Sequence, residues 1–122
     1  MLKYPYIKKV DYEAVLQLSE QVSILPGQIV SKTLAQNEAV SLTLFAFDKG
    51  EEIGTHDSEG DALVTVLEGT GEFTVEDKKY FVKAGESLVM PAKKPHAVFA
   101  PERFKMCLLV VFPYPSAEKE RT

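Results

Sequence analysis

Short apolar runs, separated by turn-forming residues, recur along most of this 122-residue chain. Four of them follow one another in its middle, each four to six residues long: residues 62–67, 72–75, 79–82 and 87–90. They are rich in β-branched and aromatic residues, and Gly, Asp or Pro stands near their ends, which is the pattern of successive antiparallel strands. Such a pattern leaves little of the chain for helices and predicts an all-β protein.

The flanking regions extend the same pattern. Residues 22–25 and 29–34 surround Pro26-Gly27, a dipeptide suited to a type II turn, and we expect them to form a hairpin. Three more strands are predicted over residues 40–47, 96–99 and 104–112. For residues 11–18 we expect a helical turn and then a short extended piece, although residues 15–18 also fit a first strand. Nine or ten short strands at this spacing indicate a β-sandwich or barrel.

The length and composition fit one small globular domain. A chain of 122 residues can bury a sizeable core, so we expect a single domain over residues 1–122. Its core should span about residues 15–113, between an N-terminal arm (1–10) and a charged C-terminal tail (116–122). Cys107 is the only cysteine and no signal-peptide pattern precedes it, which favours a reducing cytoplasm. The net charge of −4 and the lack of a long apolar run argue against nucleic-acid and membrane partners.

Two spaced motifs carry a family resemblance. Gly50 is followed after five residues by His56, and Gly69 closes this first motif. Gly85 leads after five residues to Pro91, and His96 follows at a fixed distance. In these positions the chain resembles the cupins, specifically the small single-domain members with one conserved barrel. The resemblance implies a double-stranded β-helix, or jelly-roll, barrel, with both histidines at its mouth.

The chain also departs from the cupin motifs at the positions that usually hold a metal. Ser58 replaces the second histidine of the His-x-His pair, and Ala62 replaces the glutamate. Lys93 stands where the second motif has glycine, which requires a left-handed backbone or a rebuilt loop. Because a catalytic transition metal needs about three protein ligands, His56 and His96 alone make a degenerate site. Asp61 is a possible third ligand, although strand alternation should turn it away from the pocket.

Two classes of function remain open. The first is a small-molecule-binding cupin, with a mostly apolar pocket marked by His56, His96, Ser58 and Met90. The second is a metal-dependent cupin enzyme of the dioxygenase or isomerase class. Its divalent transition metal would be held by the two histidines and a further group such as Asp61. Similarity to small cupins also implies a homodimer, formed by pairing sheets or by exchanging edge strands and N-terminal arms.

Overall fold

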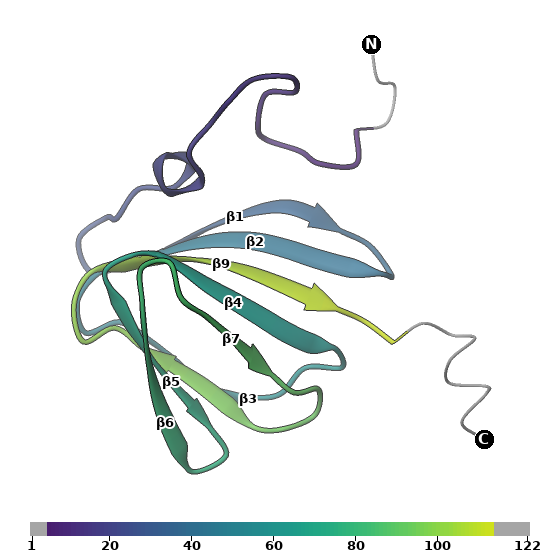
Figure 1. Cartoon of the computed structure of the whole chain (residues 1–122). Helices are drawn as coiled ribbons and strands as arrows, with labels where there is room; N and C mark the ends of the chain where they lie inside the picture. Colours follow the sequence, from purple (N-terminus) through teal and green to yellow (C-terminus); the bar gives the residue numbers. More distant parts are fainter. Residues whose placement is uncertain (1–4, 114–122) are drawn as a thin grey trace.

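The computed structural model describes residues 5–113 and contains two facing antiparallel sheets (Figure 1). The elements in chain order are a 3₁₀ turn, η1 (Leu18–Gln21), and the strands β1 (Ile29–Gln36), β2 (Val40–Phe47), β3 (Glu52–His56), β4 (Asp61–Glu68), β5 (Thr70–Val75), β6 (Lys78–Lys83), β7 (Ser87–Met90), β8 (His96–Phe99) and β9 (Phe104–Val111). The five-stranded sheet has the order β1-β2-β9-β4-β7, and the four-stranded sheet has the order β3-β8-β5-β6. This is the jelly-roll architecture that the strand pattern and the resemblance predicted.

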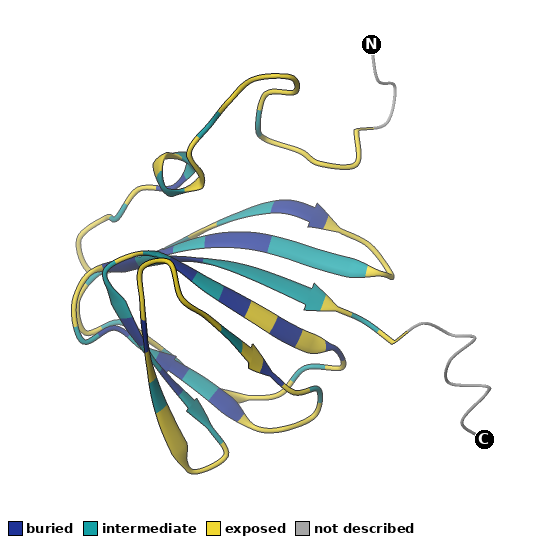
Figure 2. Ribbon diagram, viewed as in Figure 1, coloured by how far each residue is buried: buried dark blue, intermediate teal, exposed yellow. Residues whose placement is uncertain are grey.

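Side chains alternate between the space inside the two sheets and their outer faces. Along β4, buried Ala62, Val64 and Val66 alternate with more accessible neighbours, as Figure 2 shows in its bands of dark blue and yellow. Successive residues of a strand point to opposite faces, so each strand contributes every second residue to the core. The alternation is sharpest where one face meets the opposite sheet and the other meets solvent.

Aromatic side chains close one end of the space between the sheets. Phe47 from β2 stacks on Phe104 from β9 with ring centroids 4.6 Å apart, and Phe73 from β5 meets Phe104 edge-on at 6.2 Å. All three are fully buried. The backbone at Gly69 passes close beneath this cluster, because a Cβ there would lie 2.3 Å from the carbonyl oxygen of Arg103. Tight packing of large rings therefore fixes the closed end of the barrel.

Most predicted strands are confirmed, but the proposed first hairpin is wrong. The turn at Pro26-Gly27 is present, with Gly27 at φ 68°. Residues 22–25 nevertheless form no strand, and β1 pairs only with β2. Val22 and Ile24 instead pack across the outer face of the five-stranded sheet. Their apolar pattern thus reflects burial against a sheet rather than pairing within one.

The N-terminal segment also differs from expectation. The helical turn predicted from Asp11 is absent, and residues 12–13 form a simple turn in which Glu13 has φ 57°. The only described helical element is η1, a few residues later, and it is too short to cross a membrane. The irregular segment continues past the predicted arm, through Gln17, and the first strand begins at Ile29 rather than near residue 15. Residues 1–4 and the predicted tail, 116–122, lie outside the described residues.

Candidate functional site

The two histidines of the chain lie side by side. His56 ends β3, His96 begins β8 directly after Pro95, and the two residues are paired in the strand register. Their ring centroids are 4.4 Å apart with an interplanar angle of 67°. His96 is buried, with only 4% of its surface exposed, whereas His56 is exposed. Residues forty positions apart in the sequence therefore form one imidazole pair, as the motif spacing predicted.

Each imidazole is anchored through the same ring nitrogen. Nδ1 of His56 lies 2.9 Å from the carbonyl oxygen of Gly54, and Nδ1 of His96 lies 3.0 Å from that of Lys94. A carbonyl only accepts hydrogen bonds, so in the neutral form each Nδ1 carries the proton and donates it. The other nitrogen, Nε2, then bears a lone pair. The pair consequently presents two hydrogen-bond acceptors that share one orientation rule.

The environment of His96 favours its neutral form. Burial lowers the pKa of His96 below its ordinary value, the contact with the Lys94 carbonyl opposes that shift, and the nearby His56 adds to the lowering. A buried imidazole loses hydration when it becomes charged, which is the main reason for this direction. At neutral pH His96 therefore acts as an acceptor through Nε2 rather than as a cation.

Ser58 and Lys93 belong to two loops that meet beside the histidines. The Ser58 hydroxyl donates to the carbonyl of Gly60 at 2.7 Å, and the Lys93 amide donates to the Ser58 carbonyl at 2.8 Å. Lys93 has φ 66°, so it adopts the left-handed conformation that its place in the motif required. Ser58, predicted to be a ligand-binding residue, uses its hydroxyl to hold its own turn, and the two motifs are tied together by backbone contacts.

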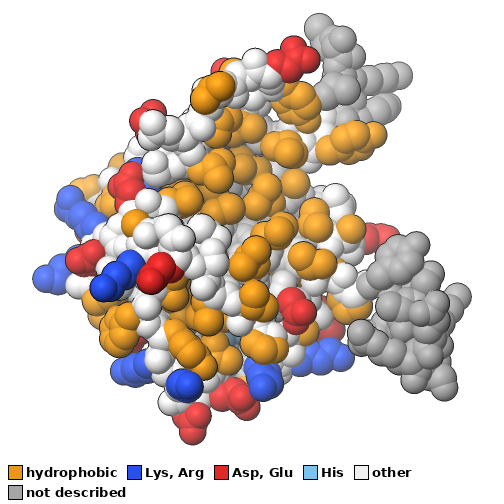
Figure 3. Space-filling model, viewed as in Figure 1, with side chains coloured by type: hydrophobic (Ala, Val, Ile, Leu, Met, Phe, Trp, Pro, Cys, Tyr) orange, Lys and Arg blue, Asp and Glu red, His pale blue; other side chains and the backbone are white. Residues whose placement is uncertain are grey.

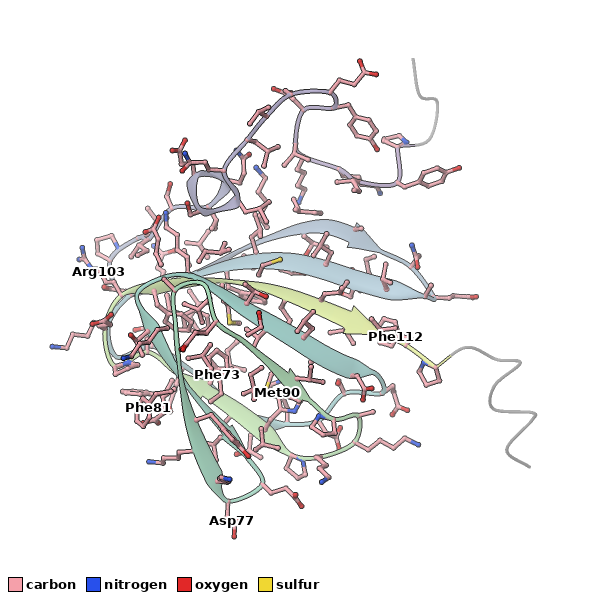
Figure 4. The ribbon with its side chains drawn as sticks, viewed as in Figure 1. Phe73, Asp77, Phe81, Met90, Arg103 and Phe112 are labelled. Atoms are coloured by element: carbon pink, nitrogen blue, oxygen red, sulfur yellow. The ribbon has the colours of Figure 1, made fainter. Side chains whose placement is uncertain are left out.

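The other predicted site residues are not brought to the imidazoles as ligands. Met90 and Ala62 face each other across the β4–β7 register and are both buried in the core. Figure 4 shows Met90 directed between the sheets. Asp61 precedes Ala62 on β4, is exposed, and accepts a hydrogen bond from the Ala92 amide at 2.8 Å. Met90 therefore contributes packing, and Asp61 stabilises the loop after β7.

These residues do not fit a tightly held catalytic metal. Within residues 5–113, no group of three or more His, Cys, Asp or Glu side chains comes together to hold an ion. Ala62 occupies the glutamate position and has no donor atom, while the Ser58 hydroxyl is engaged with Gly60. Two imidazoles and no carboxylate leave the coordination set incomplete.

The inner face of β2 carries polar groups that the sequence interpretation did not assign to the site. Cross-strand pairing puts Ser41 and Thr43 on the same face as the buried Phe47, so they point inward, while Val40, Leu42 and Leu44 point outward. Thr43 is within 3.2 Å of the Thr33 hydroxyl on β1. A strand with apolar residues at alternate positions is normally assumed to turn them inward, and here the more apolar outer face concealed this hydroxyl-bearing wall.

Inward-facing residues become more accessible away from the aromatic cluster. On β9, Phe104 and Met106 are buried, but Leu108 and Val110, which alternate with them on the same face, are partly exposed. Phe45 on β2 and Ile53 on β3 are partly exposed as well and pack against the same core. The space between the sheets is thus sealed at one end and reached by solvent at the other.

Comparisons with known proteins agree with this architecture. The family model described as Cupin domain matches residues 43–112. A conserved protein of unknown function from Streptococcus pyogenes is 43% identical, with a TM-score of 0.90, covering 93% of this chain and 99% of its own. A cupin superfamily protein from Desulfitobacterium hafniense is 31% identical, with a TM-score of 0.84, over 88% and 98% of the two chains.

A cupin 2 conserved barrel domain protein from Leptotrichia buccalis is 46% identical, with a TM-score of 0.77, over 79% of this chain and 47% of that one. Among curated proteins, none matches the chain significantly. The family model covers more than half of the chain, and the similar structures share the same fold along most of it. On sequence and on structure, this chain belongs to the cupin family.

Proposed function

We propose that this cupin binds a small organic molecule between its two sheets, and that the His56–His96 pair accepts hydrogen bonds from it. The observation that carries the proposal is the matched anchoring of both imidazoles through Nδ1, which leaves two neutral Nε2 acceptors in one place. Acceptors of this kind select ligands that donate, such as alcohols and amines.

The surroundings favour a ligand with both polar and apolar parts. Partly exposed Phe45, Leu108 and Val110 offer apolar contact on the inner face of the five-stranded sheet. Ser41 and Thr43 add hydroxyl groups on the same inner face. Small-molecule sites are typically apolar clefts with a few placed polar groups, which is the composition found here.

The test is ligand-observed NMR with a panel of defined probes: polyols, hydroxy acids, primary amines and matched ethers that lack donors. We expect binding of alcohols or amines but not of the ethers, and loss of that binding in His96→Ala and His56→Ala. Phe81→Ala, on the outer face of the four-stranded sheet, is the control and should bind normally. Binding that is unchanged in both histidine variants would contradict the proposal.

A metal-dependent cupin enzyme of the dioxygenase or isomerase class is the second candidate, and one observation favours it. Metal-bound histidines usually donate their second ring N–H to a carbonyl or carboxylate, which is the anchoring seen for both imidazoles. His56 and His96 would then need a third ligand that the described residues do not bring to them.

Metal content separates the two candidates. The protein, purified without chelators or metal-affinity resin, would be analysed for iron, manganese, nickel, copper and zinc, beside His96→Ala. The small-molecule proposal predicts far less than one metal per chain in both proteins. Near-stoichiometric metal that is lost in the variant would favour the enzyme.

A further inference from the structure

The outer face of the five-stranded sheet is unusually apolar. Register places Leu42 and Leu44 of β2, Leu109 of β9, Leu63 of β4 and Val89 of β7 on this one side. The outer face of a sheet normally meets water and carries polar side chains. This face therefore needs a cover.

The protein covers one end of the face itself. Val22 is buried against Leu34, Leu44 and Ala46, and Ile24 packs on the same cluster. The side chain of Lys105 on β9 also ties this segment down, since its ammonium group donates to the Ser19 carbonyl at 2.6 Å. Residues 18–24 thus act as an internal lid over the half of the sheet near the aromatic cluster.

The other end stays uncovered. Leu63, Val89 and Val111 expose 37%, 56% and 50% of their surface, and partly buried Leu42 and Leu109 lie between them in the sheet. In Figure 3 hydrophobic side chains gather over this side of the molecule and continue upward to the N-terminal segment. Contiguous apolar surface of this kind marks an interaction site. We call these five residues the open patch.

The N-terminal segment carries matching apolar side chains with nothing to cover them. Tyr6 is 81% exposed and Val15 is completely exposed, while Ile7 and Tyr12 are nearly half exposed. The segment is nevertheless attached to its own sheet edge, because the Lys8 amide donates to the Leu34 carbonyl at 2.7 Å. Figure 1 shows it arching away from the strands beyond β1. The chain thus presents an apolar arm and an apolar acceptor surface that it does not join.

We propose that a second copy of this chain covers the open patch, with the two five-stranded sheets face to face and each arm laid on its partner. A two-fold interface brings a surface onto itself, so it must not place like charges together. The open patch meets this condition because all five of its residues are uncharged. Residues 114–122 of the same chain are a poor alternative cover, since four of these nine residues are charged.

The area required supports participation of the arm. Half the length of four strands, about 13 Å by about 19 Å, gives roughly 250 Å² per chain. A stable interface buries about 800 Å² on each partner. Four large arm side chains, two of them aromatic, supply about 500 Å² more. Sheet and arm together reach the size of a stable dimer, whereas the sheet alone does not.

The test is the solution mass of the full chain by light scattering and its dimer dissociation constant by sedimentation. We expect twice the chain mass of 13.6 kDa at micromolar concentration. The Leu63→Asp/Val89→Asp variant should be monomeric. Phe81→Asp, a similarly exposed change on the other sheet, should stay dimeric. A monomeric wild type would overturn the proposal, and so would a dimer that survives the double change.

A second variant tests the arm without touching the sheet. The fully exposed side chain of Val15 makes it a site where Val15→Asp leaves the protomer fold intact. We expect that change to weaken the dimer at least about tenfold. An unchanged dissociation constant would refute exchange of the arms. This measurement also stands if the double variant of the sheet fails to fold.

Discussion

Two phenylalanines of the β5–β6 hairpin provide a matched test of how the sheets face each other. Phe73 on β5 points between the sheets and is fully buried, whereas Phe81 on β6 lies on the outer face and is 59% exposed (Figure 4). The same substitution to alanine can therefore be made on both sides of one hairpin. The chemical change is identical, so any difference in stability comes from the environment.

The structure sets the two magnitudes apart. Phe73→Ala removes a fully buried ring and leaves a cavity beside Phe104, which should lower the free energy of unfolding by about 3–5 kcal/mol. Phe81 is about two-fifths buried and borders solvent, so Phe81→Ala leaves no cavity. It loses roughly two-fifths of the 1.5–3 kcal/mol transfer free energy, or about 1 kcal/mol.

Urea denaturation at one fixed protein concentration measures both losses, with the m-value as a check that the transition stays comparable. We expect the Phe73 variant to lose at least twice as much stability as the Phe81 variant. Equal losses, or a larger loss at Phe81, would show that the faces of the four-stranded sheet are assigned wrongly.

Three further predictions follow from other parts of the molecule. Because the folded-state pKa of His96 is lowered, its stabilising contribution is complete above about pH 6.5 and is lost as the pH falls through that lowered pKa. Denaturation at pH 7.5 and 5.5 should thus show a larger acid loss in the wild type than in His96→Gln, and equal losses would contradict this. Gly69→Ala should cost about 1–3 kcal/mol more than Gly85→Ala by urea denaturation, because both have positive φ but only Gly69 lies against a backbone carbonyl; a similar cost at both would refute the close contact. Restoring the motif with Ser58→His and Ala62→Glu should raise Zn²⁺ affinity by orders of magnitude in calorimetry, and no gain would mean that these departures are not what weakens the site.

The strand pattern was sufficient to predict most of the sheet elements. Residues 40–47 and 104–112 fall almost on β2 and β9, because long apolar strands in the centre of a sheet carry the clearest signal. β3 was missed as a strand in its own right. Glu52–His56 is mostly exposed, contains Gly54, and pairs only with β8 through an irregular register, so little burial is written into its sequence.

The direction of side chains was harder to predict than the strands themselves. Val22 and Ile24 look like strand residues because they are buried, yet they are buried by lying across a sheet. On β2, the more apolar face turns outward, so the inward position of Ser41 and Thr43 depends on a cover that no local pattern contains. Periodicity reports that a face is buried, and tertiary packing decides what buries it.

The site was predicted in outline. Motif spacing was enough to pair His56 with His96, since the distances along the chain reflect the pairing of β3 with β8. Ser58 and Met90 were proposed as ligand contacts, and the structure gives them other partners: the Gly60 carbonyl and the core. Which side chain a loop hydroxyl bonds depends on turn geometry of a few ångströms, which residue spacing does not specify.

The most direct test of the histidine pair as a site is the long-range ¹H–¹⁵N NMR spectrum of its imidazoles in protein purified without chelators. The structure predicts that at neutral pH both rings carry their proton on Nδ1, and the proposed function adds that Nε2 is free of both proton and metal. An alcohol or amine probe should then shift both Nε2 resonances together. Rings protonated on Nε2, or resonances showing Nε2 bound to a metal, would contradict the account.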